Sequence, residues 1–206
     1  MKTTFITIAA IATLALGSAT KNTYAAVKND AAAKEMSTVL NNVKGISKIE
    51  VRGNVQVFVS DGTTDQVKVY NRYYAESAVV QNKKGVLTIA SYSSQKLVVW
   101  VTANDLHSIA VYDNAEVRSF GKLSAIDLDV KLFNNAYAKL DLNGYTASIA
   151  VNNHAKLDLA GNVTQGSLKY NRSSFVNSTN FTADHLVRTV SNENISKSES
   201  ESLVIL

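Results

Sequence analysis

The chain has 206 residues, with 21 lysines and arginines against 17 aspartates and glutamates, and its formal net charge is +4. It contains no cysteine and no proline. The missing cysteine excludes a disulfide framework and a lipidated cysteine anchor. The small, evenly spread charge argues against binding nucleic acid or an anionic membrane surface.

The first 25 residues have the pattern of a signal peptide. Met1-Lys2 is a short basic start, and Phe5 to Leu16 is an uncharged apolar run that is too short to span a bilayer. Thr23-Tyr24-Ala25 offers cleavage before Ala26, with Gly17-Ser18-Ala19 as the competing site. We therefore expect export to the periplasm, the cell surface or the medium. No later run has the roughly 18 apolar residues of a membrane helix, so no membrane span is predicted.

Residues 26–45 form a predicted leader or N-terminal cap. Met36, Val39 and Val43 have helical spacing, whereas Asn41-Asn42 oppose a helix. We expect a loose leader that becomes extended near Ser37 and enters the domain, which is predicted to occupy residues 46–206.

From Ile46 the apolar residues recur with a period of two, which is typical of half-buried strands. Val55, Val57 and Val59 alternate with Gln56 and Phe58. The same alternation predicts that the inward residues of later strands are Val67, Val69, Leu97, Val99, Val101, Ile126, Leu128, Val130 and Leu132.

A repeat covers the second half of the chain. Strand-like runs end at polar corners whose second residues are Asn114, Asn135, Asn153, Asn171 and Asn192, in steps of 21, 18, 18 and 21 residues. Lys139 to Gly144 (KLDLNG) recurs as Lys156 to Gly161 (KLDLAG). A period near 20 with strand-type residues predicts a solenoid of about eight stacked coils. The asparagines suit left-handed corners.

The order of these strands resembles one family. The residues that carry the resemblance are Ile46 to Val51, Val55 to Val59 with Asp61-Gly62, Gly85 to Ile89, and Leu97 to Thr102 followed by Leu106 to Ile109. This is the pattern of the head GIN domain, a family of exported bacterial proteins described as autotransporter adhesin heads. The resemblance covers roughly residues 37–195 and implies an all-β fold, a single-stranded right-handed β-helix.

Several acidic and histidine residues are candidates for catalytic or metal-binding groups. Asp141 and Asp158 hold equivalent places in the two copies, so we expect them to stack on one outer face beside Lys139 and Lys156. Clustered carboxylates with calcium would indicate a polysaccharide lyase, but calcium needs a convergent cage of oxygens, and a solvated strand face is the favoured explanation of this pattern. The remaining candidates, which show no zinc-ligand spacing, are Asp127, Asp129, His107, His154 and His185. The sequence predicts no enzyme, no metal and no cofactor.

Four aromatic residues are the predicted partner-binding positions. By strand alternation Phe58, Tyr70, Trp100 and Tyr112 point outward, where they could form a strip that stacks on a glycan or docks an envelope protein. The opposing interpretation is that they are covered by the leader or pack on one another. The function predicted is an exported, non-enzymatic binding or structural module of the cell envelope. The alternatives are a carbohydrate-active β-helix of the lyase or hydrolase type and a scaffold that binds nothing small.

Overall fold

The computed structural model describes residues 37–40, 43–70 and 74–192, and these residues form an all-β domain. The predicted signal peptide (1–25) and most of the predicted leader lie outside the described residues. No helix in the described part of the chain is long and apolar enough to cross a membrane. The strands are β1 (Thr38–Leu40), β2 (Lys48–Gly53), β3 (Val55–Asp61), β4 (Gln66–Val69), β5 (Ala78–Lys83), β6 (Val86–Ser91), β7 (Leu97–Ala103), β8 (Ser108–Val111), β9 (Glu116–Ser119), β10 (Leu123–Leu132), β11 (Tyr137–Val151), β12 (Lys156–Asn171) and β13 (Phe175–Ser191), and one short helix, α3 (Tyr74–Ser77), precedes β5.

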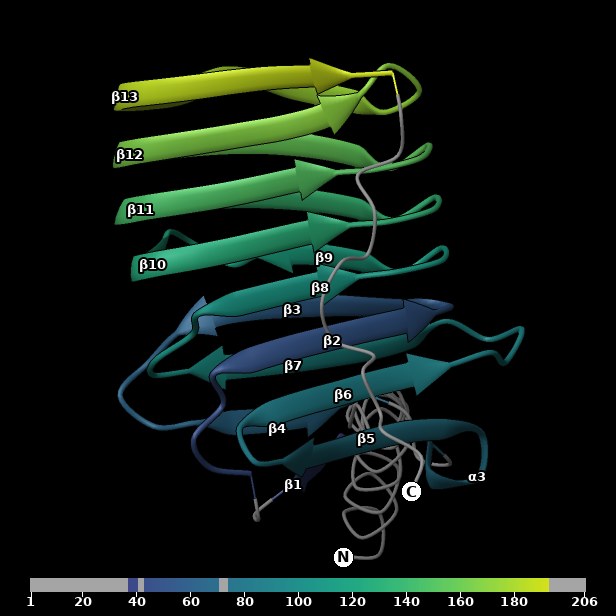
Figure 1. Cartoon of the computed structure of the whole chain (residues 1–206). Helices are drawn as coiled ribbons and strands as arrows, with labels where there is room; N and C mark the ends of the chain where they lie inside the picture. The colour runs from purple at the N-terminus through teal and green to yellow at the C-terminus, as the bar shows by residue number, and fades with distance from the viewer. Residues whose placement is uncertain (1–36, 41–42, 71–73, 193–206) are drawn as a thin grey trace, which may run out of the picture. The chain divides into compact units, whose positions relative to one another are not determined.

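The strands join into one mixed sheet. Its continuous path has the order β1-β4-β7-β3-β9-β11-β10-β8-β2-β6-β5, and β12 and β13 continue from β11 (Figure 1). The prediction of a single-stranded right-handed β-helix of about eight coils is wrong, because the domain is a curled, mixed sheet that resembles half of a barrel. Strands of the N-terminal half do not pair in chain order, since β2 lies between β6 and β8, and β3 lies between β7 and β9. Three of the pairings, β1 with β4, β4 with β7 and β5 with β6, are antiparallel.

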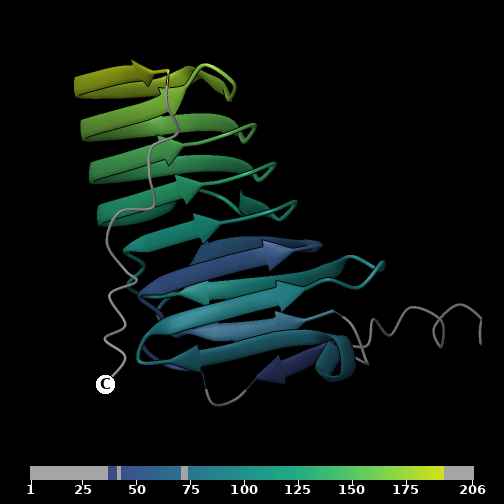
Figure 2. The ribbon, with the colours of Figure 1, turned by 45° about the vertical axis from the view of Figure 1, so that its right-hand side comes forward.

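The repeat controls only the C-terminal strands. From β10 to β12 each strand pairs in parallel with the next at a spacing of 19 residues, as in Leu123 opposite Leu142 and Tyr137 opposite Lys156. Figure 2 shows these strands side by side with their corner turns aligned. The near-20 period therefore predicts the neighbours of these strands correctly, and it fails where the N-terminal strands insert among others.

Alternation along the strands identifies the core correctly in most places. Val55, Val57 and Val59 have no exposed surface, and Leu97, Val99 and Val101 are almost fully buried, while the residues between them reach the surface. Ile126 is the exception, because it is 74 % exposed. The inward positions of β10 are Leu123 and then Leu128, five residues apart, so the alternation is interrupted where the strand curves.

Two of the polar corners are left-handed one residue earlier than the sequence predicts, and a third is left-handed at the predicted residue. The positive φ angles belong to Asp113 (61°), Asn134 (61°) and Asn153 (59°), so the prediction is right at Asn153 and wrong at Asn114, Asn135 and Asn171. In each turn the backbone nitrogen of an alanine donates to a carbonyl three residues earlier, 3.1 Å away, which makes these residues the first of the two central positions. Their side chains form a ladder, in which Asn153 Nδ2 donates to Asn134 Oδ1 (3.0 Å) and Asn134 Nδ2 donates to Asp113 Oδ1 (3.1 Å).

Candidate functional site

Two of the four predicted aromatic residues lie together on the outer face of the sheet. Phe58 on β3 and Trp100 on β7 are directly opposite each other, with ring centroids 5.2 Å apart. Phe120, which follows β9, adds a third ring 4.9 Å from Trp100. We call Phe58, Trp100 and Phe120 the aromatic platform. Because Phe120 is 61 % exposed and the other two rings are half-buried, the platform presents aromatic surface to solvent.

The other two predicted residues do not contact the platform among the described residues. Tyr112 stacks on Phe133 with centroids 5.0 Å apart and planes at 7°, and the Arg52 guanidinium lies 3.8 Å from the Tyr112 centroid. Tyr70 is half-buried directly after β4, where its backbone nitrogen donates to the carbonyl of Val98 (2.9 Å). The four aromatics therefore do not form one strip.

Phe120 is a candidate that the sequence analysis missed. Val117 is buried, so strand alternation places Arg118 and then Phe120 on the outer face. The same period-two rule that selected Phe58 would have selected Phe120.

A row of outward residues connects the platform with the C-terminal strands. Lys68 lies opposite Trp100, and Arg118 lies opposite Phe58. Lys139 follows opposite Arg118, and then come Asp158 and Asn177 on the next two strands. We call this series the outer row: Lys68, Trp100, Phe58, Arg118, Lys139, Asp158 and Asn177.

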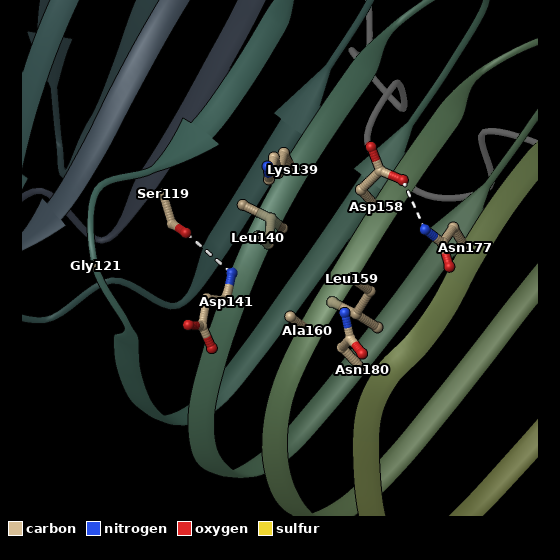
Figure 3. Close-up of a pocket in the computed structure, with 10 residues that line it drawn as sticks. All are labelled: Ser119, Gly121, Lys139, Leu140, Asp141, Asp158, Leu159, Ala160, Asn177 and Asn180. Atoms are coloured by element: carbon tan, nitrogen blue, oxygen red, sulfur yellow. Dashed lines mark hydrogen bonds between the residues drawn. The ribbon is translucent and has the colours of Figure 1, made fainter.

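The outer row ends in a polar hollow of about 440 Å³ (Figure 3). Ser119 and Gly121 line its near side, and these are the two chain neighbours of Phe120. The hollow therefore begins beside the aromatic platform. The polar side chains that line it are Ser119, Lys139, Asp141, Asp158, Asn177 and Asn180.

Asp158 is held on both of its carboxylate oxygens. The Tyr137 hydroxyl donates to Oδ2 (2.7 Å), and Asn177 Nδ2 donates to Oδ1 (3.2 Å). Asn177 Oδ1 in turn accepts a bond from the Thr179 hydroxyl (2.9 Å). Burial and the hydrogen bond to Asp158 raise the pKa of Tyr137 above its usual value. The Asp158 carboxylate is therefore fixed in place and occupied.

Three other polar side chains in the hollow have no hydrogen-bond partner among the described residues, although Ser119 beside them does. Ser119 Oγ accepts a bond from the Asp141 backbone nitrogen (2.9 Å), which ties β11 to the end of β9 (Figure 3). The side chains of Lys139, Asp141 and Asn180 make no hydrogen bond or ion pair with another described residue, and all three line the hollow. One cation, one carboxylate and one amide are thus available to a ligand.

The predicted stacking of Asp141 on Asp158 is not what the pairing produces. Asp158 lies opposite Lys139, and Asp141 lies opposite Ala160. The two sequence copies are 17 residues apart, whereas the strands pair at 19 residues, so the copies are offset by two positions. This offset puts opposite charges across from each other in place of like charges.

A β-bulge shapes the far side of the hollow. Asp158 pairs with Asn177, but Ala160 pairs with Asn180, so β13 has one extra residue at this point. Residues three apart normally point to opposite faces of a strand, and the bulge lets Asn177 and Asn180 line the same hollow. Nothing in the sequence indicates this extra residue.

Glu116 forms a charged network beside the outer row. Lys96 Nζ lies 2.7 Å from one of its oxygens, and Gln56 Nε2 (3.0 Å) and Arg118 (3.6 Å) approach the other. Burial acts to raise the pKa of Glu116, but the hydrogen bond and charge of Lys96, together with Arg118, outweigh it and lower the pKa below 4.5.

We expect Glu116→Gln to lower stability at neutral pH and to lose this effect in acid. A carboxyl whose pKa is lower in the folded state stabilises the fold above its unfolded pKa, near 4.5, and this contribution is lost as the pH falls through the lower folded value. Thermal melts of both proteins across the acid range measure the difference. Glu50→Gln is the control, because Glu50 has a single lysine partner, Lys48, at 2.8 Å. A gap between wild type and Glu116→Gln that stays constant into strong acid would contradict the assignment.

The remaining acidic and histidine candidates are dispersed. Asp129 pairs with Lys131 (2.8 Å), and His107 lies 3.2 Å from Asp105. His154 and His185 are exposed on other segments, as is Asp127. Within the described residues no group of three or more histidine, cysteine, aspartate or glutamate side chains is placed to hold a metal ion.

Comparison with known structures supports the fold. A putative adhesin from Bacteroides fragilis superposes with a TM-score of 0.65 at 14 % identity, covering 75 % of each chain. A putative adhesin from Parabacteroides distasonis gives 0.56 at 16 % identity, covering 75 % of this chain and 77 % of the other. A putative lipid binding protein from the same species gives 0.59 at 9 % identity, with the same coverage. At these identities the likeness establishes the fold alone.

None of the curated proteins matches the chain. A family model described as "Putative auto-transporter adhesin, head GIN domain" matches residues 46–197, which is most of the chain. The protein therefore belongs to the head GIN domain family of auto-transporter adhesin type, as the order of its N-terminal strands predicted.

Proposed function

We propose that the protein is an exported, non-enzymatic binding module of the bacterial cell envelope, which holds its partner on the aromatic platform. The observation that carries this proposal is the platform itself. Rings from three separate segments gather on the outer face of the sheet, where Trp100 contacts both Phe58 and Phe120, and Phe120 remains 61 % exposed. Rings held by strands lose little conformational entropy on contact and supply a large binding area.

Other features support parts of the proposal. The family is described as an adhesin head, and two of the similar structures are named adhesins. Export rests on the signal-peptide pattern of residues 1–25, which we place before a leader (26–45) and the binding domain (46–206). A glycan is the favoured partner, because flat rings beside a hollow lined with amides and carboxylates suit sugar rings and their hydroxyls.

The carbohydrate-active alternative is less well supported. A lyase or hydrolase needs carboxyl groups that can exchange protons with a substrate. Asp158 accepts hydrogen bonds on both oxygens, which leaves Asp141 as the one unoccupied carboxylate that lines the hollow. New reducing ends or unsaturated products after incubation with polysaccharides would restore this alternative.

The matched test compares two phenylalanines that are each 61 % exposed, Phe120 in the platform and Phe175 on β13. Purified domain is sedimented with bacterial envelope fragments over a range of concentrations. Phe120→Ala and Trp100→Ala should weaken binding about tenfold, which corresponds to roughly 1.4 kcal/mol, whereas Phe175→Ala should bind as wild type does.

Two treatments of the envelope identify the partner class. Periodate destroys sugar rings, and protease removes proteins, so loss of binding after periodate alone indicates a glycan. Equal affinities for Phe120→Ala and Phe175→Ala would refute the platform as the binding surface.

A further inference from the structure

The aromatic platform and the polar hollow form one continuous surface. Trp100 and Asn177 belong to the same outer row, five strand steps apart. Neighbouring strands are separated by about 4.8 Å, so the row measures roughly 24 Å. A pyranose unit in an extended oligosaccharide advances by about one strand spacing, so the row can meet such a chain with one unit per strand.

The hollow separates fixed polar groups from available ones. Asp158 and Asn177 are held by each other and by Tyr137 and Thr179. By contrast, the side chains of Asp141 and Asn180 have no partner among the described residues, although both line the hollow. The β-bulge that brings Asn180 to this face is a feature that commonly re-aims side chains at binding sites.

The charges favour a neutral ligand over an acidic one. Lys139 is the one basic side chain that lines the hollow, against the carboxylates Asp141 and Asp158. Along the row, Arg118 is offset by Glu116 (3.6 Å), and Lys139 lies opposite Asp158. An acidic polysaccharide would meet the Asp141 carboxylate in the hollow, and two of the three basic side chains of the row, Arg118 and Lys139, already lie beside a carboxylate.

From this geometry we propose that the outer row and the hollow are an extended site for a neutral pyranose oligosaccharide. One sugar ring stacks on Trp100 and Phe120. Hydroxyl groups of units farther along donate hydrogen bonds to the Asp141 carboxylate, and they both donate to and accept from the Asn180 amide. The inference rests on the proposed function and adds the class of ligand, the direction in which the oligosaccharide crosses the strands and the residues that bind it.

The test uses neutral hexasaccharides of glucose, mannose, galactose and N-acetylglucosamine, with hexagalacturonate as the acidic probe. Trp100 is the only tryptophan in the chain, so its fluorescence reports contact at the platform, and calorimetry measures affinity. Asp141→Ala and Asn180→Ala should each weaken the preferred neutral hexasaccharide about fivefold to tenfold, as the loss of one or two hydrogen bonds predicts. The corresponding monosaccharide, which covers only the platform, should bind all variants equally. Asp127→Ala, an exposed aspartate on β10, is the control for a general charge effect.

Three results would overturn the inference: no binding of any neutral hexasaccharide, tighter binding of hexagalacturonate, or unchanged hexasaccharide affinity in both hollow variants. These results are distinguishable from failure of the proposed function. If Phe120→Ala still weakens envelope binding while the hollow variants bind normally, the platform binds a partner and only the oligosaccharide site is refuted.

Discussion

Gly161→Ala is expected to destabilise the domain by about 3–5 kcal/mol, the range of severe single substitutions. Gly161 on β12 has a φ of +109° and lies opposite Leu142 on β11. A β-carbon at this position would overlap the backbone oxygen of Leu142 and lie 2.6 Å from its nitrogen. Because these are backbone atoms of a paired strand, no side-chain rotation relieves the overlap, and the β11–β12 pairing itself must shift.

Gly45→Ala separates steric overlap from backbone strain. Gly45 has a φ of +66°, but an added β-carbon would meet nothing within 4 Å. Its substitution should therefore cost about 1–2 kcal/mol, the strain of a left-handed alanine. Urea unfolding of both variants, followed by far-ultraviolet circular dichroism, measures the two free energies. If Gly161→Ala is no less stable than Gly45→Ala, the strands do not approach each other so closely.

The strands of this domain are predictable from the sequence, but the order in which they lie side by side in the sheet is not. Alternation depends on neighbouring residues in one strand, so it identifies the buried valines of β3 and the leucine and valines of β7. Pairing between strands depends on which turns bring segments together. The 19-residue spacing of β10 to β12 is visible as a repeat, whereas the insertion of β2 between β6 and β8 leaves no periodic trace. The repeat therefore predicts the pairing of β10 to β12 correctly, but the prediction that the whole domain is a β-helix of stacked coils is wrong.

The candidate site was predictable to a similar extent. Alternation places Phe58 and Trp100 outward, and register then brings them together. The hollow was not foreseeable, because it depends on a bulge in β13 and on an offset between the sequence copies that puts Lys139 opposite Asp158. Tyr112 follows from the same rule as Phe58, but the strand before it, β8, lies between β2 and β10, away from β3 and β7 in the sheet order.

Asn134→Val is expected to destabilise the domain by about 2–3 kcal/mol, from left-handed strain in a branched residue and the loss of two exposed hydrogen bonds. Asn134 has a φ of 61° at the first central position of its turn. Its side chain donates to Asp113 (3.1 Å) and accepts from Asn153 (3.0 Å), so it is the middle member of the corner ladder. Valine resists the left-handed backbone conformation and cannot form either of the two side-chain hydrogen bonds, so this one substitution causes both losses.

Asn134→Gly and Asn135→Val divide this loss into its causes. Glycine adopts the left-handed conformation without strain, so Asn134→Gly should lose only the two rungs, about 1 kcal/mol. Asn135 has no positive φ and makes one longer bond, 3.3 Å to Asn114, so valine there should cost less than about 1 kcal/mol. Denaturant midpoints of the three variants should rank Asn134→Val lowest. The reverse ranking, with Asn135→Val the less stable, would place the left-handed residue at the second member of the pair, because the strain follows whichever residue carries the positive φ.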